Sequence, residues 1–138
     1  MIIERWAKIV PCLSEFQHHL APHIPILKLE QANDRMWSEQ EYREQCRTGI
    51  FERYGVYVIF APDESLEYVG IAMNRFHNRI WSHDDHLNRR WTDVISLPRE
   101  YYWLGPALEF FLIVRLQPPK NSVYKAYAIP ELLRLDQT

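Results

Sequence analysis

Two β-rich runs separated by a short turn constrain the fold of this chain most. Residues 55–60 read Gly-Val-Tyr-Val-Ile-Phe and are rich in the β-branched and aromatic side chains that strands favour. Residues 61–65 have the composition of a turn, and residues 66–70 form a second strand-like run. The sequence therefore predicts a β-hairpin at this point.

Tyr57 and Tyr68 fall in the two predicted hairpin strands. In an antiparallel pair, residues directly opposite each other point to the same face of the sheet. The two tyrosines therefore share a face only if the sequence numbers of two residues that lie opposite each other in the hairpin have an odd sum. Core packing explains either ring on its own, so a shared face is the informative observation.

The remaining patterns predict helices and one more strand. Residues 2–10 and 12–20 have helical spacing that is separated or kinked at Pro11, because proline removes a helical hydrogen bond. Ser38 and Glu41 form a capping box that should start a helix over residues 39–47, closing at Gly49. Further along, the spacing predicts a helix over 74–86, a strand over 91–97 and a helix over 106–116.

This order of elements predicts an α+β fold with a small three-stranded antiparallel sheet flanked by helices. Residues 1–50 should form a helical extension packed on the core, since they hold too many apolar side chains to remain in water. A chain of 138 residues is long enough for one such domain.

Composition and charge narrow the function classes. No apolar run is long enough to cross a membrane, and residues 1–8 lack the apolar centre of a signal peptide, so we expect a cytoplasmic protein without a membrane partner. The formal net charge of −2 argues against a protein held to nucleic acid by bulk electrostatics. Arginine nevertheless supplies 12 of the 16 cations, and its guanidinium suits phosphate.

Two features point to chemistry. Arg75, Arg79 and His83 would lie along one edge of the helix over 74–86, where they could hold a phosphate or simply face solvent. Glu109 would share a face with apolar residues of the helix over 106–116, where a carboxylate is costly without a partner. A structural salt bridge and a metal-binding or catalytic role are both open explanations for Glu109.

Together these residues resemble the motifs of the GIY-YIG nuclease family. Gly55-Val56-Tyr57 is similar to the first motif and Tyr68-Val69-Gly70 to the second. Arg79 follows nine residues after Gly70, and His83 follows four residues later. Glu109 is followed by Pro118 at +9 and Asn121 at +12, as in the glutamate-to-Pro-x-x-Asn run of the family. The resemblance spans residues 51–123 as a nuclease core and leaves residues 124–138 as a C-terminal tail.

The resemblance implies a metal-dependent endonuclease that hydrolyses phosphodiester bonds, with DNA as the favoured nucleic acid. One Mg²⁺ or Mn²⁺ ion per active site would bind Glu109, and a monomer or a homodimer would carry the activity. The implied catalytic residues are Tyr57, Tyr68, Arg79, His83, Glu109 and Asn121, and the implied substrate-binding residues are Arg75 and Gly70.

The general base is open between Tyr57 and His83. A tyrosine has a reference pKa near 10, so a base at neutral pH needs a shift of about three units, or roughly 4 kcal/mol, whereas the reference pKa of histidine is already close. The alternative function is a catalytically inactive GIY-YIG-like module that binds nucleic acid or protein.

Overall fold

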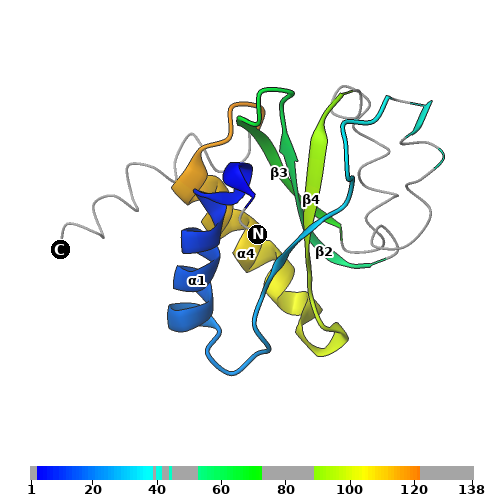
Figure 1. Cartoon of the computed structure of the whole chain (residues 1–138). Coiled ribbons are helices and arrows are strands. Elements are labelled where there is room, and N and C mark those ends of the chain that lie inside the picture. The colour runs from blue at the N-terminus through cyan, green and yellow to red at the C-terminus, as the bar shows by residue number, and fades with distance from the viewer. Residues whose placement is uncertain (1–2, 39, 42–43, 45–52, 73–88, 122–138) are drawn as a thin grey trace.

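The computed structural model describes residues 3–38, 40–41, 44, 53–72 and 89–121, which form a sheet with helices packed against it. Figure 1 shows the two longer helices together on one side of the sheet. In chain order the elements are η1 (Glu4–Trp6), α1 (Ile9–Leu20), β1 (Leu29–Gln31), β2 (Gly55–Phe60), β3 (Leu66–Ala72), β4 (Trp91–Ser96), η4 (Arg99–Leu104) and α4 (Gly105–Leu116).

The sheet is antiparallel with strand order β1-β4-β2-β3, and the α+β class is confirmed. Within the described residues it has four strands, so the prediction of three was wrong. The additional strand, β1, pairs with β4 from Leu29 opposite Ile95 to Gln31 opposite Asp93. A strand of three residues is too short to show the alternation by which strands are recognised in a sequence.

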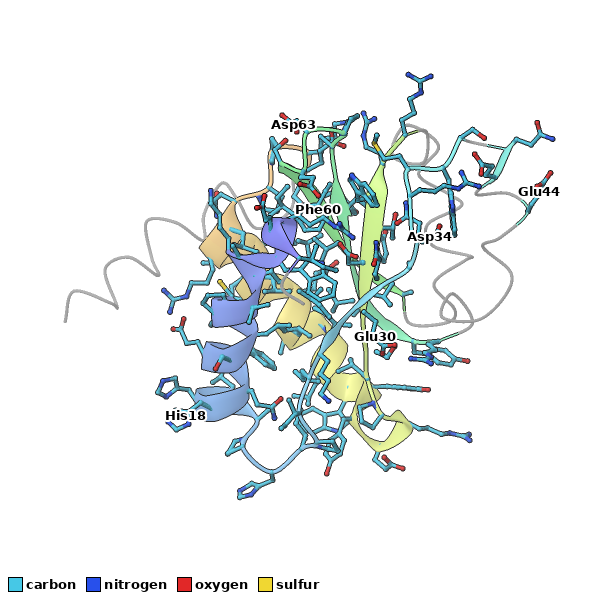
Figure 2. All side chains as sticks on the ribbon, in the orientation of Figure 1. His18, Glu30, Asp34, Glu44, Phe60 and Asp63 are labelled. Atoms are coloured by element: carbon cyan, nitrogen blue, oxygen red, sulfur yellow. The ribbon has the colours of Figure 1, made fainter. Side chains whose placement is uncertain are left out.

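The predicted hairpin is present as β2 and β3. Its turn is closed by the N–H of Ala61, which donates to the carbonyl of Ser65 over 2.8 Å. Asp63 lies at the tip of the turn (Figure 2) and accepts a hydrogen bond of 3.0 Å from the N–H of Ser65. The turn chemistry that marked these residues in the sequence therefore closes the hairpin.

The N-terminal helices differ from the prediction at Pro11. A 3-10 helix occupies Glu4–Trp6, and one continuous α-helix then runs from Ile9 to Leu20 with Pro11 in its first turn. The N–H groups of a first turn have no partner within the helix, so proline removes no hydrogen bond there. The break that we expected at Pro11 thus lies before Ile9 instead.

The helix α4 agrees with its prediction. Pro106 lies in its first turn, and the helix ends before Gln117, whose φ of 49° is left-handed. The N–H of Gln117 donates to the carbonyl of Ile113, which satisfies one of the last carbonyls of the helix.

A hydrophobic core lies between helices α1 and α4 and one face of the sheet. Helix α1 contributes three buried side chains, and Phe16 meets Phe111 of α4 edge to face with 5.5 Å between ring centroids. The buried members of this core are Ile9, Leu13, Phe16, Ala21, Leu27, Leu29, Val56, Val58, Phe60, Val69, Ile95, Leu97, Leu104, Leu108, Leu112 and Ile113. The segment from Ile9 to Leu29 therefore contributes to the same core as the hairpin.

The capping box is confirmed. The N–H of Glu41 donates to the Ser38 hydroxyl, and the N–H of Ser38 donates to the Glu41 carboxylate, each over 3.2 Å. The end of that helix at Gly49 and the whole helix predicted over 74–86 lie outside the described residues. Within the described ranges, no helix combines the length and apolar character that a membrane crossing requires.

Candidate functional site

The hairpin register brings Tyr57 and Tyr68 together. Tyr57 lies opposite Gly70 and Ile59 lies opposite Tyr68, so opposed residue numbers add up to 127 along this stretch. The two rings are consequently on one face, stacked with 6.0 Å between their centroids. The odd total that a shared face requires is confirmed, with the rings as diagonal rather than direct neighbours.

Gly70 leaves the space that the Tyr57 ring occupies. A Cβ at Gly70 would overlap the ring and the hydroxyl of Tyr57, and Tyr57 is 0% exposed and therefore cannot swing outward. Only glycine fits opposite this tyrosine, because any other residue places a carbon atom there. The geometry thus gives Gly70 a packing role, and its contact with substrate stays a prediction.

Gly55 is needed at the start of β2 for two reasons. Its φ of 145° is one that other residues rarely adopt, and a Cβ there would overlap the carbonyl oxygen of Ile95 in β4. Packing alone therefore requires glycine at both motif positions, Gly55 and Gly70, independently of the function of the protein.

Asn121 binds the outer edge of β3 beside the tyrosine pair. The N–H of Val69 donates to Asn121 Oδ1 over 2.9 Å, and Asn121 Nδ2 donates to the Val69 carbonyl over 2.9 Å. The N–H of Lys120 also donates to the carbonyl of Glu67 over 3.0 Å. Because β3 is at the edge of the sheet, the buried amide of Asn121 replaces the hydrogen bonds of a neighbouring strand and fixes the backbone between Tyr68 and Gly70.

Glu109 lies in the middle of α4 and is half-buried, so the carboxylate that we expected on a buried face of this helix is partly exposed. Three apolar neighbours were predicted to share its face: Leu112 and Ile113 are buried in the core, and Leu116 packs against it partly buried. Helix α4 packs with the face of β2 that presents Val56 and Val58, whereas Tyr57 points to the other face. Glu109 and the tyrosine pair therefore belong to different layers.

The described residues thus bring together Tyr57, Tyr68 and Asn121, while Glu109 belongs to α4, which packs on the other face of the sheet. Arg79 and His83, as well as Arg75, lie outside the described residues, so their predicted roles remain predictions.

The carboxylate of Glu109 is compatible with a sparse magnesium site. Mg²⁺ is often held by one or two carboxylates and completes its shell with water and phosphate oxygens. A half-exposed carboxylate admits such a hydrated ion. No group of three or more His, Cys, Asp and Glu side chains occurs in the described part of the chain, so a site built entirely from protein ligands is not formed by those residues.

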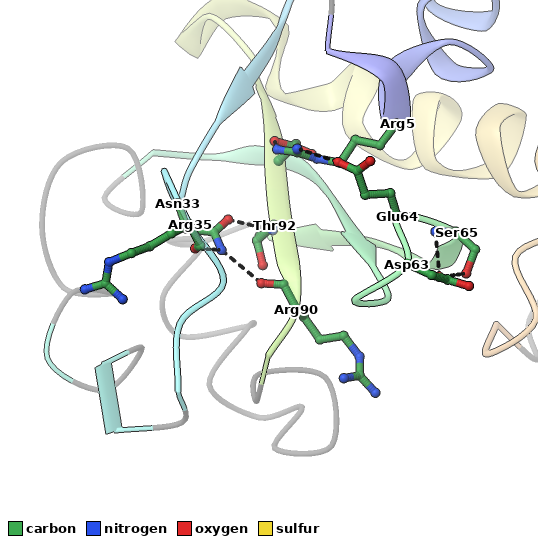
Figure 3. A network of polar contacts seen from close by, with 9 residues as sticks. Arg5, Asn33, Arg35, Asp63, Glu64, Ser65, Arg90 and Thr92 are labelled. Carbon is green, nitrogen blue, oxygen red and sulfur yellow. Dashed lines mark hydrogen bonds and ion pairs between the residues drawn. The ribbon is translucent and has the colours of Figure 1, made fainter.

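A buried ion pair that the sequence analysis missed joins the N-terminus to the sheet. Arg5 Nε donates to Asp93 Oδ2 over 2.7 Å and Arg5 Nη2 donates to Asp93 Oδ1 over 2.8 Å. The guanidinium stacks on Trp91 at 4.5 Å from the ring centroid. Figure 3 shows Arg5 reaching from η1 toward β4, with Glu64 of the hairpin turn alongside. The sequence signal was a charged residue, Asp93, in the middle of a predicted strand.

Burial raises the pKa of Asp93, and this effect outweighs the hydrogen bonds from Arg5 that lower it. The indole N–H of Trp6 also faces Asp93 and lowers the pKa, although its geometry falls outside that of a hydrogen bond. Glu64 adds a weaker effect that raises the pKa. The pair is therefore an element of structure whose charge is held in a dry environment, rather than a solvent-facing binding group.

A second buried asparagine fixes the opposite side of the sheet. The N–H of Thr92 donates to Asn33 Oδ1 over 2.9 Å, and Asn33 Nδ2 donates to the carbonyls of Arg35 and Arg90 over 2.7 and 2.9 Å (Figure 3). Asn33 thereby continues the pairing of β4 beyond the end of β1. Asn33 and Asn121 perform the same task at the two sides of the sheet, by satisfying backbone groups where no strand pairs.

Comparisons with known proteins add no relative: no family model matches the chain, and no curated protein or solved structure matches it significantly.

Proposed function

We propose that the protein is a metal-dependent endonuclease that hydrolyses phosphodiester bonds in nucleic acid, with DNA favoured. The observation that carries the proposal is the tyrosine pair stacked beside Gly70, on a strand that Asn121 holds in place. A strand edge fixed in this way keeps a phenol in one position, as a group that orients a reacting water requires.

Tyr68 is the tyrosine suited to contact water. Its side chain is partly exposed, whereas Tyr57 is completely buried and serves as the surface on which Tyr68 is stacked. We therefore assign the orientation of the attacking water to Tyr68 and the positioning of Tyr68 to Tyr57. His83, whose reference pKa is near neutrality, is the better candidate for the general base.

Glu109 would hold the metal ion, which supplies charge neutralisation at the phosphate and stabilisation of the leaving oxygen. Arg79 would bind the non-bridging phosphate oxygens through its guanidinium. Because Glu109 and the tyrosine pair lie in different layers, the nucleic-acid strand would have to extend past the edge of β3 to meet both. One such site cuts one strand, so a double-strand cut needs a homodimer or two successive reactions.

The alternative is an inactive module that binds nucleic acid or protein. The complete burial of Tyr57 and the separate layer of Glu109 favour it, because both remove groups from a common water-filled site. The two functions differ in a simple measurement. The nuclease nicks supercoiled plasmid when Mg²⁺ or Mn²⁺ is present and stops when EDTA removes the ion, whereas the inactive module leaves the plasmid intact in both conditions.

Glu109→Gln provides the sharper test. We expect nicking to fall at least about 10²-fold if the carboxylate holds the ion, and the metal-induced gain in thermal stability to disappear. The metal-free variant should be as stable as the parent, because glutamine keeps the shape and removes a charge. If Glu109 is a structural ion-pair partner instead, its loss should lower the free energy of unfolding by about 1–2 kcal/mol, between the values for surface and buried pairs.

Glu15→Gln is the matched control. Glu15 is another partly exposed helical carboxylate, and it pairs with Arg115 over 2.7 Å on the surface. It should change neither nicking nor the response to metal. Equal losses in the two variants would contradict a metal site at Glu109.

A further inference from the structure

A pocket of about 670 Å³ lies between helix α1 and the segment that joins this helix to β1. Figure 1 shows the chain turning at the end of α1 and returning toward β1. Leu13, Leu27 and Leu29 belong to the hydrophobic core and also line the pocket, so its inner wall is apolar. The volume falls within the range of roughly 300–1,000 Å³ that is typical of sites for small molecules.

The side chain of Gln17 holds the two walls of the pocket together. Its N–H groups donate to the carbonyls of Ala21 and Ile24 over 2.8 and 3.2 Å, and its carbonyl accepts a hydrogen bond of 2.7 Å from the N–H of Leu27. Both N–H groups and the carbonyl of this amide are therefore already engaged. A ligand that enters the pocket finds a preformed wall, and an apolar body suits that wall best.

Two large apolar side chains line the pocket and remain exposed. Val10 of α1 is 49% exposed, and Ile26 of the returning segment is 76% exposed. An apolar ligand that covers them removes hydrocarbon surface from water, which favours binding. The pocket therefore offers an apolar interior and an apolar opening to the same ligand.

The ionisable side chains that line the pocket, among the described residues, are both basic in type. They are Lys28 and His18, and no described aspartate or glutamate lines the pocket. Both side chains are exposed, so their polar ends can lie at the mouth, and Figure 2 shows His18 near the end of α1. No described acid forms an ion pair with Lys28, since Glu15 of the same helix is paired with Arg115. The charge at the mouth therefore favours a negative group on the ligand.

We propose that this pocket binds a single-chain amphiphile with an anionic head, of the fatty-acid class, whose alkyl chain lies against the leucines and whose carboxylate faces Lys28. The apolar wall selects the chain, and the lysine selects the sign of the head. A single chain can enter a hollow of this volume, whereas a flat lipid surface would cover only its opening. This binding function is separate from the proposed cleavage of nucleic acid and needs none of its residues.

The test compares ligands that share a chain and differ in the head. The full-length protein is titrated by calorimetry with octanoate, decanoate and decylammonium, each below the concentration at which it forms micelles. Lys28→Glu reverses the charge at the mouth, and Val10→Trp places a large ring at the opening. The matched controls are Lys8→Glu, at an exposed lysine that does not line the pocket, and Leu20→Ala, which removes a 60% exposed apolar side chain of the same helix outside the pocket.

We expect the parent to bind decanoate more tightly than decylammonium. Lys28→Glu should weaken decanoate binding about 2- to 30-fold and strengthen decylammonium binding, as when the attraction of an exposed ion pair is replaced by an equal repulsion. Decanoate should bind the parent more tightly than octanoate by about 4-fold for each added methylene group. Val10→Trp should weaken both decyl ligands at least as much as the loss of two methylene groups. Both controls should bind as the parent does.

Several results would overturn the proposal. These are the absence of saturable decanoate binding, equal binding of decanoate and decylammonium that Lys28→Glu does not change, and losses in the controls as large as those in the pocket variants. Binding of decanoate only within phospholipid vesicles would instead indicate a membrane surface. Self-association that Val10→Trp abolishes, without decanoate binding, would indicate an interface between two copies of the chain. The substituted residues are exposed, so the variants should fold, which urea denaturation checks.

Discussion

Replacing Arg5 by methionine should destabilise the protein more than the same replacement at an arginine of a surface ion pair, because Arg5 is buried. Arg5 is 8% exposed and Asp93 is 0% exposed, and the guanidinium makes two short hydrogen bonds to the carboxylate. Methionine keeps much of the apolar stem that stacks on Trp91 and removes the charge. The carboxylate of Asp93 is then left buried without its principal partner.

The expected magnitude follows from that geometry. Removing one member of a buried ion pair lowers the free energy of unfolding by about 3–5 kcal/mol, because the remaining charge loses compensation. Asp93→Val should cost less than Arg5→Met, since Arg5 can still approach Glu64 at 3.6 Å and stack on Trp91. The double variant should be more stable than Arg5→Met, because apolar replacement of both members removes the uncompensated charge.

The effect of Arg5→Met should depend on pH with a defined sign. Burial already raises the folded-state pKa of Asp93 above 3.8, and loss of Arg5 removes an interaction that lowers it. A group whose pKa is higher in the folded state destabilises the fold above that pKa and less so as the pH falls through it toward 3.8. The penalty should therefore be full at neutral pH and shrink as the carboxyl becomes protonated.

Urea denaturation followed by tryptophan fluorescence measures these free energies, and an unchanged slope of free energy against urea indicates that the two end states are the same. Arg115→Met is the control, since Arg115 and Glu15 are 37% and 40% exposed and such pairs contribute about 0–1 kcal/mol. A cost below about 1 kcal/mol for Arg5→Met at neutral pH, equal to that of the control, would refute the buried pair and with it the docking of the N-terminus on the sheet.

Three further changes test the site and its surroundings. Gly70→Ala should lower the free energy of unfolding by about 1–3 kcal/mol, because the new Cβ meets Tyr57. When Tyr57 is also replaced by alanine, Gly70→Ala should cost no further free energy, which a double-mutant cycle in urea measures. Asn121→Ala should cost about 2–4 kcal/mol by leaving two buried backbone groups of β3 unpaired, and amide hydrogen exchange in β3 should accelerate; unchanged exchange would argue against the clamp. Arg35 holds the pKa of Glu41 below 4.5, so their interaction stabilises the fold above pH 4.5 and is lost as the pH falls through the lowered pKa. Arg35→Gln should raise the pKa of Glu41 in an NMR titration, and an unchanged pKa would count against the pair.

Local elements were accessible from the sequence because their causes are local. The hairpin follows from β-branched residues and a turn of known chemistry, and the capping box from two residues three positions apart. The sequence also supplied the condition under which Tyr57 and Tyr68 share a face, an odd sum of opposed residue numbers, because side chains alternate between the two faces of a strand. The extent of α4 needed only Pro106 and the prolines that follow it.

Features that depend on distant residues needed the tertiary structure. Arg5 and Asp93 are 88 positions apart, and nothing near either residue specifies the other. Asn121 could be marked by its place in a motif, but its two bonds to Val69 follow from the position of β3 at the sheet edge. Strand β1 exists because β4 offers it backbone partners, as its three residues alone carry no strand signal.

The candidate site divides along the same line. The sequence by itself determined the order and spacing of the glycine, tyrosine, glutamate and asparagine residues of the motifs, and these indicated which chemistry to consider. The tertiary structure decided that Tyr57 is buried, that Tyr68 is partly exposed beside it, and that Glu109 belongs to the helix layer. Spacing along a chain fixes order and local direction, whereas exposure and the layer that a side chain enters depend on which distant elements pack against it.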